Sequence, residues 1–252
     1  MNCEFFRIFA SMNDGMNTPI LLREMLSLRN NEEAKGLMRS FKTGKGQYGE
    51  GDQFLGIRVP MTREVVKRLW KTTTIEDLKT CIESPWHEVR LAALLTLIQM
   101  FKHNRKHPDK QKECIDFYLA HTDRINNWDL VDLSCYELLG TWLLDKDRTL
   151  LYDLARNGKT IWEQRIGIVS TMQFLRHHQL DDTYAISDIL LNHTHNLIHK
   201  AVGWLLREAG KRDEQRLILY LNERHRTMPR TMLRYAIERL PEPARQQYLQ
   251  RK

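Results

Sequence analysis

Two pairs of side chains that could act on a charged ligand occur at helical spacing in the chain. In "INNWDLVDLS" (residues 125–134) Trp128 precedes Asp132 by four residues, and in "LIHKAVGWL" (197–205) Lys200 precedes Trp204 by four. Side chains four residues apart lie about 40° from each other around an α-helix, so the members of each pair face the same way. The first pair sets a carboxylate beside an aromatic wall, and the second sets a cation beside an indole.

Asp132 is unusual because it falls at the edge of an apolar stripe. On a helical wheel Cys135 and Leu139 lie within about 20° of Trp128, and Asp132 lies at about 40°. An unpaired carboxylate in such a place is costly. Two interpretations follow: either Asp132 pairs with Arg165 of the following repeat while Trp128 fills the core, or Asp132 is a functional acid in a dry cleft.

A cation is out of place in the next helical segment. Apolar residues and Arg165 share one face there, at Ile161, Arg165, Ile168, Met172 and Leu175. A tryptophan in the middle of a helix is usually a core residue, and Trp204 taken alone fits that description. Two tryptophans on the faces that also carry misplaced charges favour a site.

The elements that would position these residues are helices in a repeat. Five segments align on one charged residue each, and the spacings between these residues are 42, 33, 35 and 34: Arg90, Asp132, Arg165, Lys200 and Arg234. Such a period is typical of HEAT-like helical pairs that stack into a solenoid. No stretch alternates as a strand, so we expect an all-α superhelix with the five side chains lining a concave basic groove. Residues 20–252 would form a single domain, and residues 1–19 a flexible extension.

The positive charge is concentrated toward the C-terminus. The net charge is +7, and residues 195–252 carry 13 basic against 6 acidic side chains, whereas residues 1–194 carry 26 of each. This asymmetry indicates a surface for a polyanion, although a solvated basic face without a partner would look the same.

Other motifs point away from cofactors, metals and membranes. "GKGQYG" (44–49) matches a dinucleotide-binding pattern, but no strand precedes it. "HTHNLIH" brings His193, His195 and His199 together without a completing ligand, so a solvated loop with a helix start is the better interpretation than a metal site. The four scattered cysteines form no CxxC pair, and the longest strongly apolar run, 91–101, has eleven residues. We therefore expect a cytoplasmic protein with no cofactor, no metal and no membrane contact.

Several segments occur in order along roughly residues 20–250: "FLGIRVP", "INNWDLVDLS", "WEQRIGIVSTMQFLR", "IHKAVGWLLREAGKRD" and "MPRTMLRYAIERLPE". Together they resemble the bacterial DNA alkylation repair glycosylases of the AlkD type, which are HEAT-like repeat proteins. The resemblance implies that Trp128, Asp132 and Trp204 form the catalytic trio and that Arg165 contacts a backbone phosphate. The chain departs from some members at Asn127, where a second Trp can occur, and in its extended loop at residues 42–52.

The chemistry implied by the resemblance is release of purines alkylated at N3 or N7, such as 3-methyladenine and 7-methylguanine. These bases already carry positive charge, so no general acid is needed. Asp132 would stabilise an oxocarbenium-like sugar and position a water, and the two indoles would face the cationic nucleotide. The family is thought to act without extruding the base, in contrast to most glycosylases.

The predicted partner is double-stranded DNA carrying alkylated bases, bound by a monomer through Arg165, Lys200, Arg90 and Arg234. The nearest alternative is a non-catalytic relative that binds damaged or branched DNA, and a protein scaffold is a more distant one. A scaffold has no need of an acid in an apolar stripe, so the four residues Trp128, Asp132, Arg165 and Trp204 favour the glycosylase.

Overall fold

The computed structural model describes residues 18–250, which are helical apart from turns, loops and one isolated bridge between Gln53 and Trp86. The predicted all-α fold is confirmed. The chain divides into two compact units, Met1–Cys114 and Ile115–Lys252. The expected extension at residues 1–19 lies outside the described residues, except for Thr18 and Pro19.

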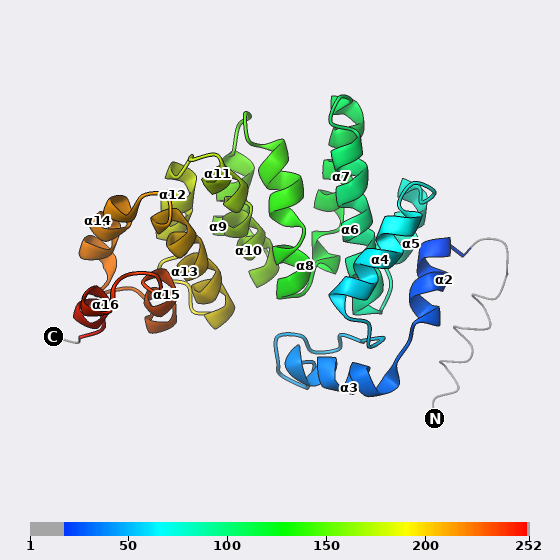
Figure 1. The fold of residues 1–252 in the computed structure, drawn as a ribbon, viewed down its shortest axis with the longest axis horizontal. Helices are drawn as coiled ribbons and strands as arrows, with labels where there is room; N and C mark the ends of the chain where they lie inside the picture. Colours follow the sequence, from blue (N-terminus) through cyan, green and yellow to red (C-terminus); the bar gives the residue numbers. More distant parts are fainter. Residues whose placement is uncertain (1–17, 251–252) are drawn as a thin grey trace. The chain divides into compact units, whose positions relative to one another are not determined.

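Unit 1 is built around one buried helix. Its elements are α2 (Ile20–Ser27), α3 (Asn31–Ser40), α4 (Val59–Leu69), α5 (Ile75–Ile82), α6 (His87–His103) and the start of α7 (Pro108–Ala120). Helix α6 holds the longest apolar run and is buried on nearly every side, while α2, α4 and α5 pack against it (Figure 1). A helix that is apolar all round must be covered in this way.

The entry to α4 is fixed by a buried carboxylate. The Glu88 side chain accepts three backbone N–H bonds, from Leu55, Gly56 and Ile57, at 2.8 to 3.0 Å. Gly56 has φ +89°, and a Cβ built there would lie 2.0 Å from the carbonyl oxygen of Asn30. No other residue fits, which explains the glycine in "FLGIRVP".

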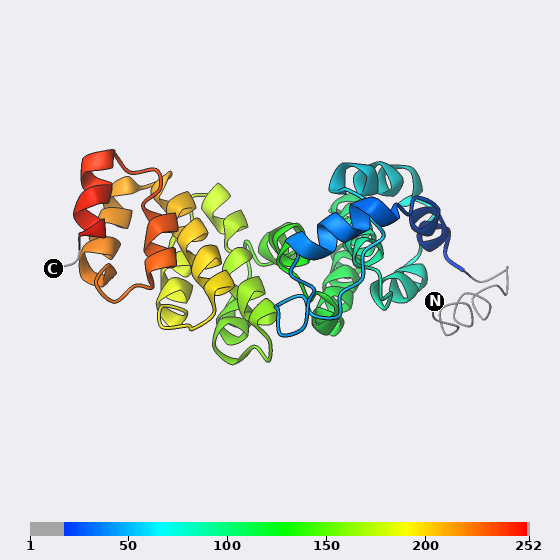
Figure 2. The ribbon, with the colours of Figure 1, turned by 90° about the horizontal axis from the view of Figure 1, so that it is seen from below.

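Unit 2 is a run of short helices. After the end of α7 come the 3₁₀ turn Thr122–Arg124, α8 (Trp128–Asp132), the π-helical turn Tyr136–Gly140, α9 (Thr149–Asn157), α10 (Ile161–Val169), α11 (Met172–Arg176), α12 (Asp181–Ile189), α13 (Asn196–Gly210), α14 (Glu214–Arg224), α15 (Arg230–Ala236) and α16 (Glu242–Leu249). Helices α8, α10, α13 and α15 pack successively, with α9, α12 and α14 against them. Figures 1 and 2 show α10, α13 and α15 as neighbours. This succession is the helical repeat expected from the sequence.

The close approach of two backbones sets the spacing between the successive helices α13 and α15. A Cβ at Gly203 of α13 would lie 2.4 Å from the carbonyl oxygen of Met232 and 2.5 Å from Cβ of Tyr235, both on α15. The missing side chain therefore lets α13 and α15 pack against each other.

Two predicted helices are interrupted. The segment containing Val131, Cys135, Leu138 and Trp142 is an α-helix only as far as Asp132, and continues through the π-helical turn. Likewise the stripe from Ile161 to Leu175 is broken at Ser170 and Thr171. The Thr171 hydroxyl donates to the carbonyl of Ile168 at 2.7 Å, and such local side-chain bonds compete with helix continuation.

None of the helices in the described part of the chain is long and apolar enough to cross a membrane.

Candidate functional site

Helix α8 places Trp128 and Asp132 at its two ends, one turn apart. Asn127 caps the helix, and its side chain accepts from the backbone N–H of Trp128 at 2.9 Å. The Asp129 side chain accepts from the N–H of Leu130 at 2.9 Å and is itself buried. Two buried polar residues, Asn127 and Asp129, thus fix the start of α8. The carboxylate of Asp132 at the other end of the helix finds its partner on α10.

Asp132 is paired with Arg165 of α10. Arg165 Nε donates to Asp132 Oδ1 at 2.8 Å and Nη2 donates to Oδ2 at 2.7 Å, a two-pronged contact. The third prong, Nη1, donates to the carbonyl oxygen of Leu197 just inside α13. The Asp132 side chain is 15% exposed and that of Arg165 is 6% exposed. Arg165 therefore ties three successive helices of unit 2 together.

The first interpretation of Asp132 is right about the ion pair and wrong about the indole. Trp128 is 36% exposed, so it does not fill the core. Other ion pairs also join residues about one repeat apart in this unit, for example Arg148 with Asp182 and Arg224 with Asp188. The pair alone is therefore a general structural device, and the exposed indole beside it is what distinguishes this position.

The pKa of Asp132 is displaced by its surroundings. Burial raises the pKa of this carboxyl above its usual value, and the Arg165 guanidinium opposes that shift. Behind it lie Tyr118 and Cys135, both fully buried, and burial raises the pKa of each. The wall behind the carboxylate is thus uncharged, and each carboxylate oxygen keeps lone-pair capacity beyond its bond to Arg165.

The repeat predicted from the spacing places equivalent residues at equivalent positions. Each of the four charged side chains assigned to unit 2 is the fifth residue of its helix: Asp132 of α8, Arg165 of α10, Lys200 of α13 and Arg234 of α15. Because these helices pack in that order, the four residues follow one another across unit 2. We call these four residues the charged row.

The members of the charged row differ in their partners. Asp132 and Arg165 are bound to each other, whereas within the described residues no hydrogen bond or ion pair holds the ammonium of Lys200 or the guanidinium of Arg234. Arg234 is exposed, and Lys200 and Trp204 are half-buried one turn apart on α13. Two cations at the C-terminal end of the row are therefore available to an anion.

Arg90 lies in unit 1 and is surrounded differently. Its side chain is 3% exposed and donates to Asp52 at 2.6 Å and to the carbonyl of Ser84 at 2.9 Å. Asp52 also contacts the ring of His87 at 2.8 Å and ends the loop at residues 42–52. A phosphate would have to displace Asp52 from this arginine. The arrangement favours a structural role, in which Arg90 fixes the end of the glycine-rich loop.

Sequence reasoning missed the turn that contacts Arg165. The predicted helix start at the histidines is confirmed, because His195 caps α13, and the turn is partly solvated, since Thr194 and Asn196 are exposed whereas His193 and His195 are half-buried. His193 contacts Gln164 of α10 at 2.9 Å, and Leu197 supplies the carbonyl that Arg165 binds. A backbone carbonyl leaves no signal in a sequence, whereas the cluster of three histidines around the start of the helix is a visible signal.

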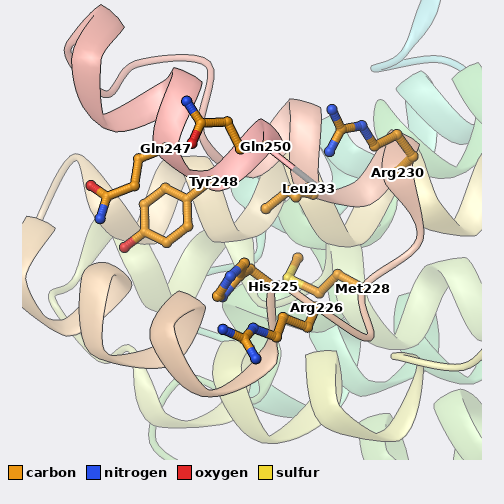
Figure 3. A pocket seen from close by; sticks show the side chains of 8 residues that line it. All are labelled: His225, Arg226, Met228, Arg230, Leu233, Gln247, Tyr248 and Gln250. Atoms are coloured by element: carbon orange, nitrogen blue, oxygen red, sulfur yellow. The ribbon is translucent and has the colours of Figure 1, made fainter. Parts of the chain in front are cut away.

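A pocket of about 540 Å³ opens between the end of α14, α15 and α16. Figure 3 shows the residues that line it: His225, Arg226, Met228, Arg230, Leu233, Gln247, Tyr248 and Gln250. Neither this pocket nor a second one of about 320 Å³ near Arg207 is lined by a residue of the charged row. Two arginines and no acid line the larger pocket, which extends the positive character of α15.

The fold and the site define an all-α helical-repeat protein with a paired carboxylate and free cations on successive helices. The sequence profile of the DNA alkylation repair enzyme family matches residues 21–240, and the chain belongs to this family. A solved structure from Enterococcus faecalis, described as a "predicted DNA alkylation repair enzyme", is similar with a TM-score of 0.67 at 18% identity. The match covers 85% of this chain and 97% of that one, and shows a shared fold. No curated protein matches the chain.

Proposed function

We propose that the protein is a DNA glycosylase that hydrolyses the N-glycosidic bond of purines alkylated at N3 or N7 in duplex DNA. The observation that carries this proposal is the exposed Trp128 one turn from Asp132, at one end of a row whose other end has two free cations. Membership of the DNA alkylation repair enzyme family supports DNA as the substrate.

In this proposal the backbone of the damaged strand lies along the charged row. Lys200 and Arg234 neutralise phosphates, which supplies affinity independent of sequence. Trp128 and Trp204 face the deoxyribose and the cationic base, where their electron-rich faces attract positive charge. Because Trp128 lies at the surface, it can meet the sugar from the backbone side while the base stays stacked in the duplex.

Asp132 performs the chemical role. An N3- or N7-alkylated purine leaves as a neutral base when its glycosidic bond breaks, and the positive charge passes to the sugar. A carboxylate fixed near the anomeric carbon stabilises that charge and accepts a proton from the attacking water. Arg165 holds the Asp132 carboxylate in place through two hydrogen bonds and favours the ionised form of that carboxylate. The position of Asp132 beside Trp128 directs the carboxylate toward the sugar.

One observation favours a second candidate, a protein that binds damaged DNA without cleaving it. Both oxygens of Asp132 already accept from Arg165, as in an ion pair that only joins two repeats. Such a protein would use Lys200 and Arg234 in the same way and would leave the glycosidic bond intact.

The test is release of 7-methylguanine from duplex DNA, measured by chromatography of the free base under single-turnover conditions with excess protein. The proposal predicts release well above spontaneous depurination, with a matched unmethylated duplex giving none. Tight binding to both duplexes with release at the spontaneous rate would support the second candidate instead.

A further inference from the structure

The turn that leads into α13 is held by its own histidines. We call His193–Leu197 the histidine turn. Nδ1 of His193 accepts from the backbone N–H of His195 at 2.9 Å, and Nδ1 of His195 accepts from the N–H of Leu197 at 3.2 Å. His199, one turn into α13, contacts the carbonyl oxygen of His193 through Nε2.

These contacts define the protonation state of two rings. A nitrogen that accepts a backbone N–H must carry a lone pair, so both Nδ1 atoms are unprotonated and each neutral ring carries its proton on Nε2. The Nε2–H of His193 then donates to Oε1 of Gln164 at 2.9 Å. Protonation of either Nδ1 would set its new hydrogen against the backbone N–H hydrogen and would break that hydrogen bond.

The turn is joined to α10 by two neighbouring residues. Gln164 accepts from His193, and Arg165 donates to the carbonyl oxygen of Leu197, which lies at the other end of the turn. The same guanidinium forms the two bonds to Asp132. The position of Leu197 therefore limits where Arg165 can hold the carboxylate.

We propose that the histidine turn positions Arg165 against Asp132, and does so only while His193 and His195 are neutral. The proposal assigns both histidines as positioning residues, since they act on the site through Arg165. Protonation breaks the cap of α13, moves the Leu197 carbonyl and removes the third contact of Arg165. The carboxylate then loses its fixed geometry in the acid range.

The surroundings keep both rings neutral at neutral pH. Burial is the largest cause that lowers the pKa of His193 and of His195, and nearby positive groups add to it. The charged or titratable groups that act on the turn are His199 from α13 and Arg165 from α10. A histidine with a lowered pKa takes up its proton only at a pH below the usual value of 6.5, so the turn stays intact at neutral pH and opens when the pH falls through the lowered pKa.

Nuclear magnetic resonance of the uniformly ¹⁵N-labelled protein tests the turn without reference to catalysis. Long-range ¹H–¹⁵N spectra at neutral pH should show both rings with Nε2–H and an unprotonated Nδ1, assigned by loss of signals in His193→Asn and His195→Asn. The Nε–H resonance of Arg165 should broaden or shift as the pH falls through the midpoint of these two histidines. A proton on either Nδ1 at neutral pH, or an Arg165 resonance unaffected across that midpoint, would overturn the proposal.

Excision kinetics supply the second arm, which rests on the proposed glycosylase function. Asn at both positions keeps an oxygen acceptor near the place of Nδ1, because Asn is a good helix cap. It also removes the titration, because its side chain does not ionise in this pH range. With each protein normalised to its own neutral plateau, we expect the log excision rate to fall more steeply with falling pH in the wild type, in which His193, His195 and Asp132 titrate. In the double variant Asp132 is the group of these three that still titrates, and its limiting slope is about one per pH unit. His177→Asn, at an exposed position after α11, is the matched control and should keep the wild-type slope.

The two arms fail in different ways. Equal acid slopes in the wild type and the double variant would refute the positioning role even if excision occurs. Absence of excision altogether would refute the proposed function, and the resonance of Arg165 would then decide on the turn alone.

Discussion

Arg165 holds Asp132 by two parallel hydrogen bonds, of 2.8 and 2.7 Å, across the packed helices α10 and α8. The same contact supports structure and the proposed chemistry, so variants must be paired with controls that separate the two. Arg148 and Asp182 offer such a control, because they also lie about one repeat apart and Asp182 is 13% exposed, close to the value for Asp132.

Removal of the guanidinium should be costly to stability. Arg165→Ala leaves a largely buried carboxylate without its partner, and we expect a loss of about 3 kcal/mol in the free energy of unfolding. Arg165→Lys keeps the charge without the two-pronged geometry and should lose less. Urea denaturation followed by circular dichroism measures both. Equal stability of Arg165→Ala and the wild type would show that the pair contributes nothing.

DNA binding should depend on salt through the free cations of the row. Lys200→Ala and Arg234→Ala should each reduce the slope of log affinity against log salt concentration by about one, because each removes one phosphate contact. Lys211→Ala is the control, since this lysine lies at the opposite end of α13 and pairs with Glu208. Fluorescence anisotropy with a labelled duplex gives the slopes. A slope reduced equally by the control would place the DNA elsewhere.

The exposed indole should matter for excision more than for folding. Because Trp128 is 36% exposed, Trp128→Ala should lower the melting temperature only slightly. Loss of its contact with a cationic nucleotide, worth up to about 2 kcal/mol, should slow excision by about tenfold or more. Trp142→Ala is the control, as this half-buried indole is contacted by the ammonium of Lys146 and is not part of the proposed site. Similar rates in the two variants would remove Trp128 from the site.

The pH profile should report the raised pKa of Asp132. As the pH falls through that pKa, the carboxyl becomes neutral and excision should decline with a midpoint above the usual value of 3.8. The protonated form is favoured by folding, because the pKa is higher in the folded chain, so this group itself does not cause acid unfolding. The His193→Asn/His195→Asn variant isolates the effect, and a midpoint at or below 3.8 would contradict it.

The repeat could be predicted from the sequence because a charged residue recurs at a regular spacing within the apolar helical stripes. Spacings of 33, 35 and 34 link Asp132, Arg165, Lys200 and Arg234, and each proves to be the fifth residue of its helix. The partner of Asp132 was also among the expected alternatives. These features depend on side-chain type and helical period, which a sequence shows directly.

Other parts of the site depend on contacts that a sequence does not show. The π-helical turn after α8 interrupts a stretch that the apolar spacing predicts as one α-helix, and at the break at Ser170 and Thr171 a local hydrogen bond competes with the helical pattern. Arg90 was aligned with the row at the longer spacing of 42 residues, yet in the structure its guanidinium is bound by Asp52. The Leu197 carbonyl that completes the site around Arg165 belongs to the backbone, so its role emerges only from the structure.

The most direct test of the account is single-turnover release of 7-methylguanine by Asp132→Asn and by Asp182→Asn, measured at a temperature at which both variants are folded. Each change removes one charge from an ion pair, so both should lower the melting temperature to a similar extent. Only Asp132→Asn should slow excision, by about 100-fold or more, equivalent to about 3 kcal/mol, with DNA affinity retained. Parental excision by a folded, DNA-binding Asp132→Asn variant, or an equal loss in Asp182→Asn, would contradict a catalytic role for Asp132.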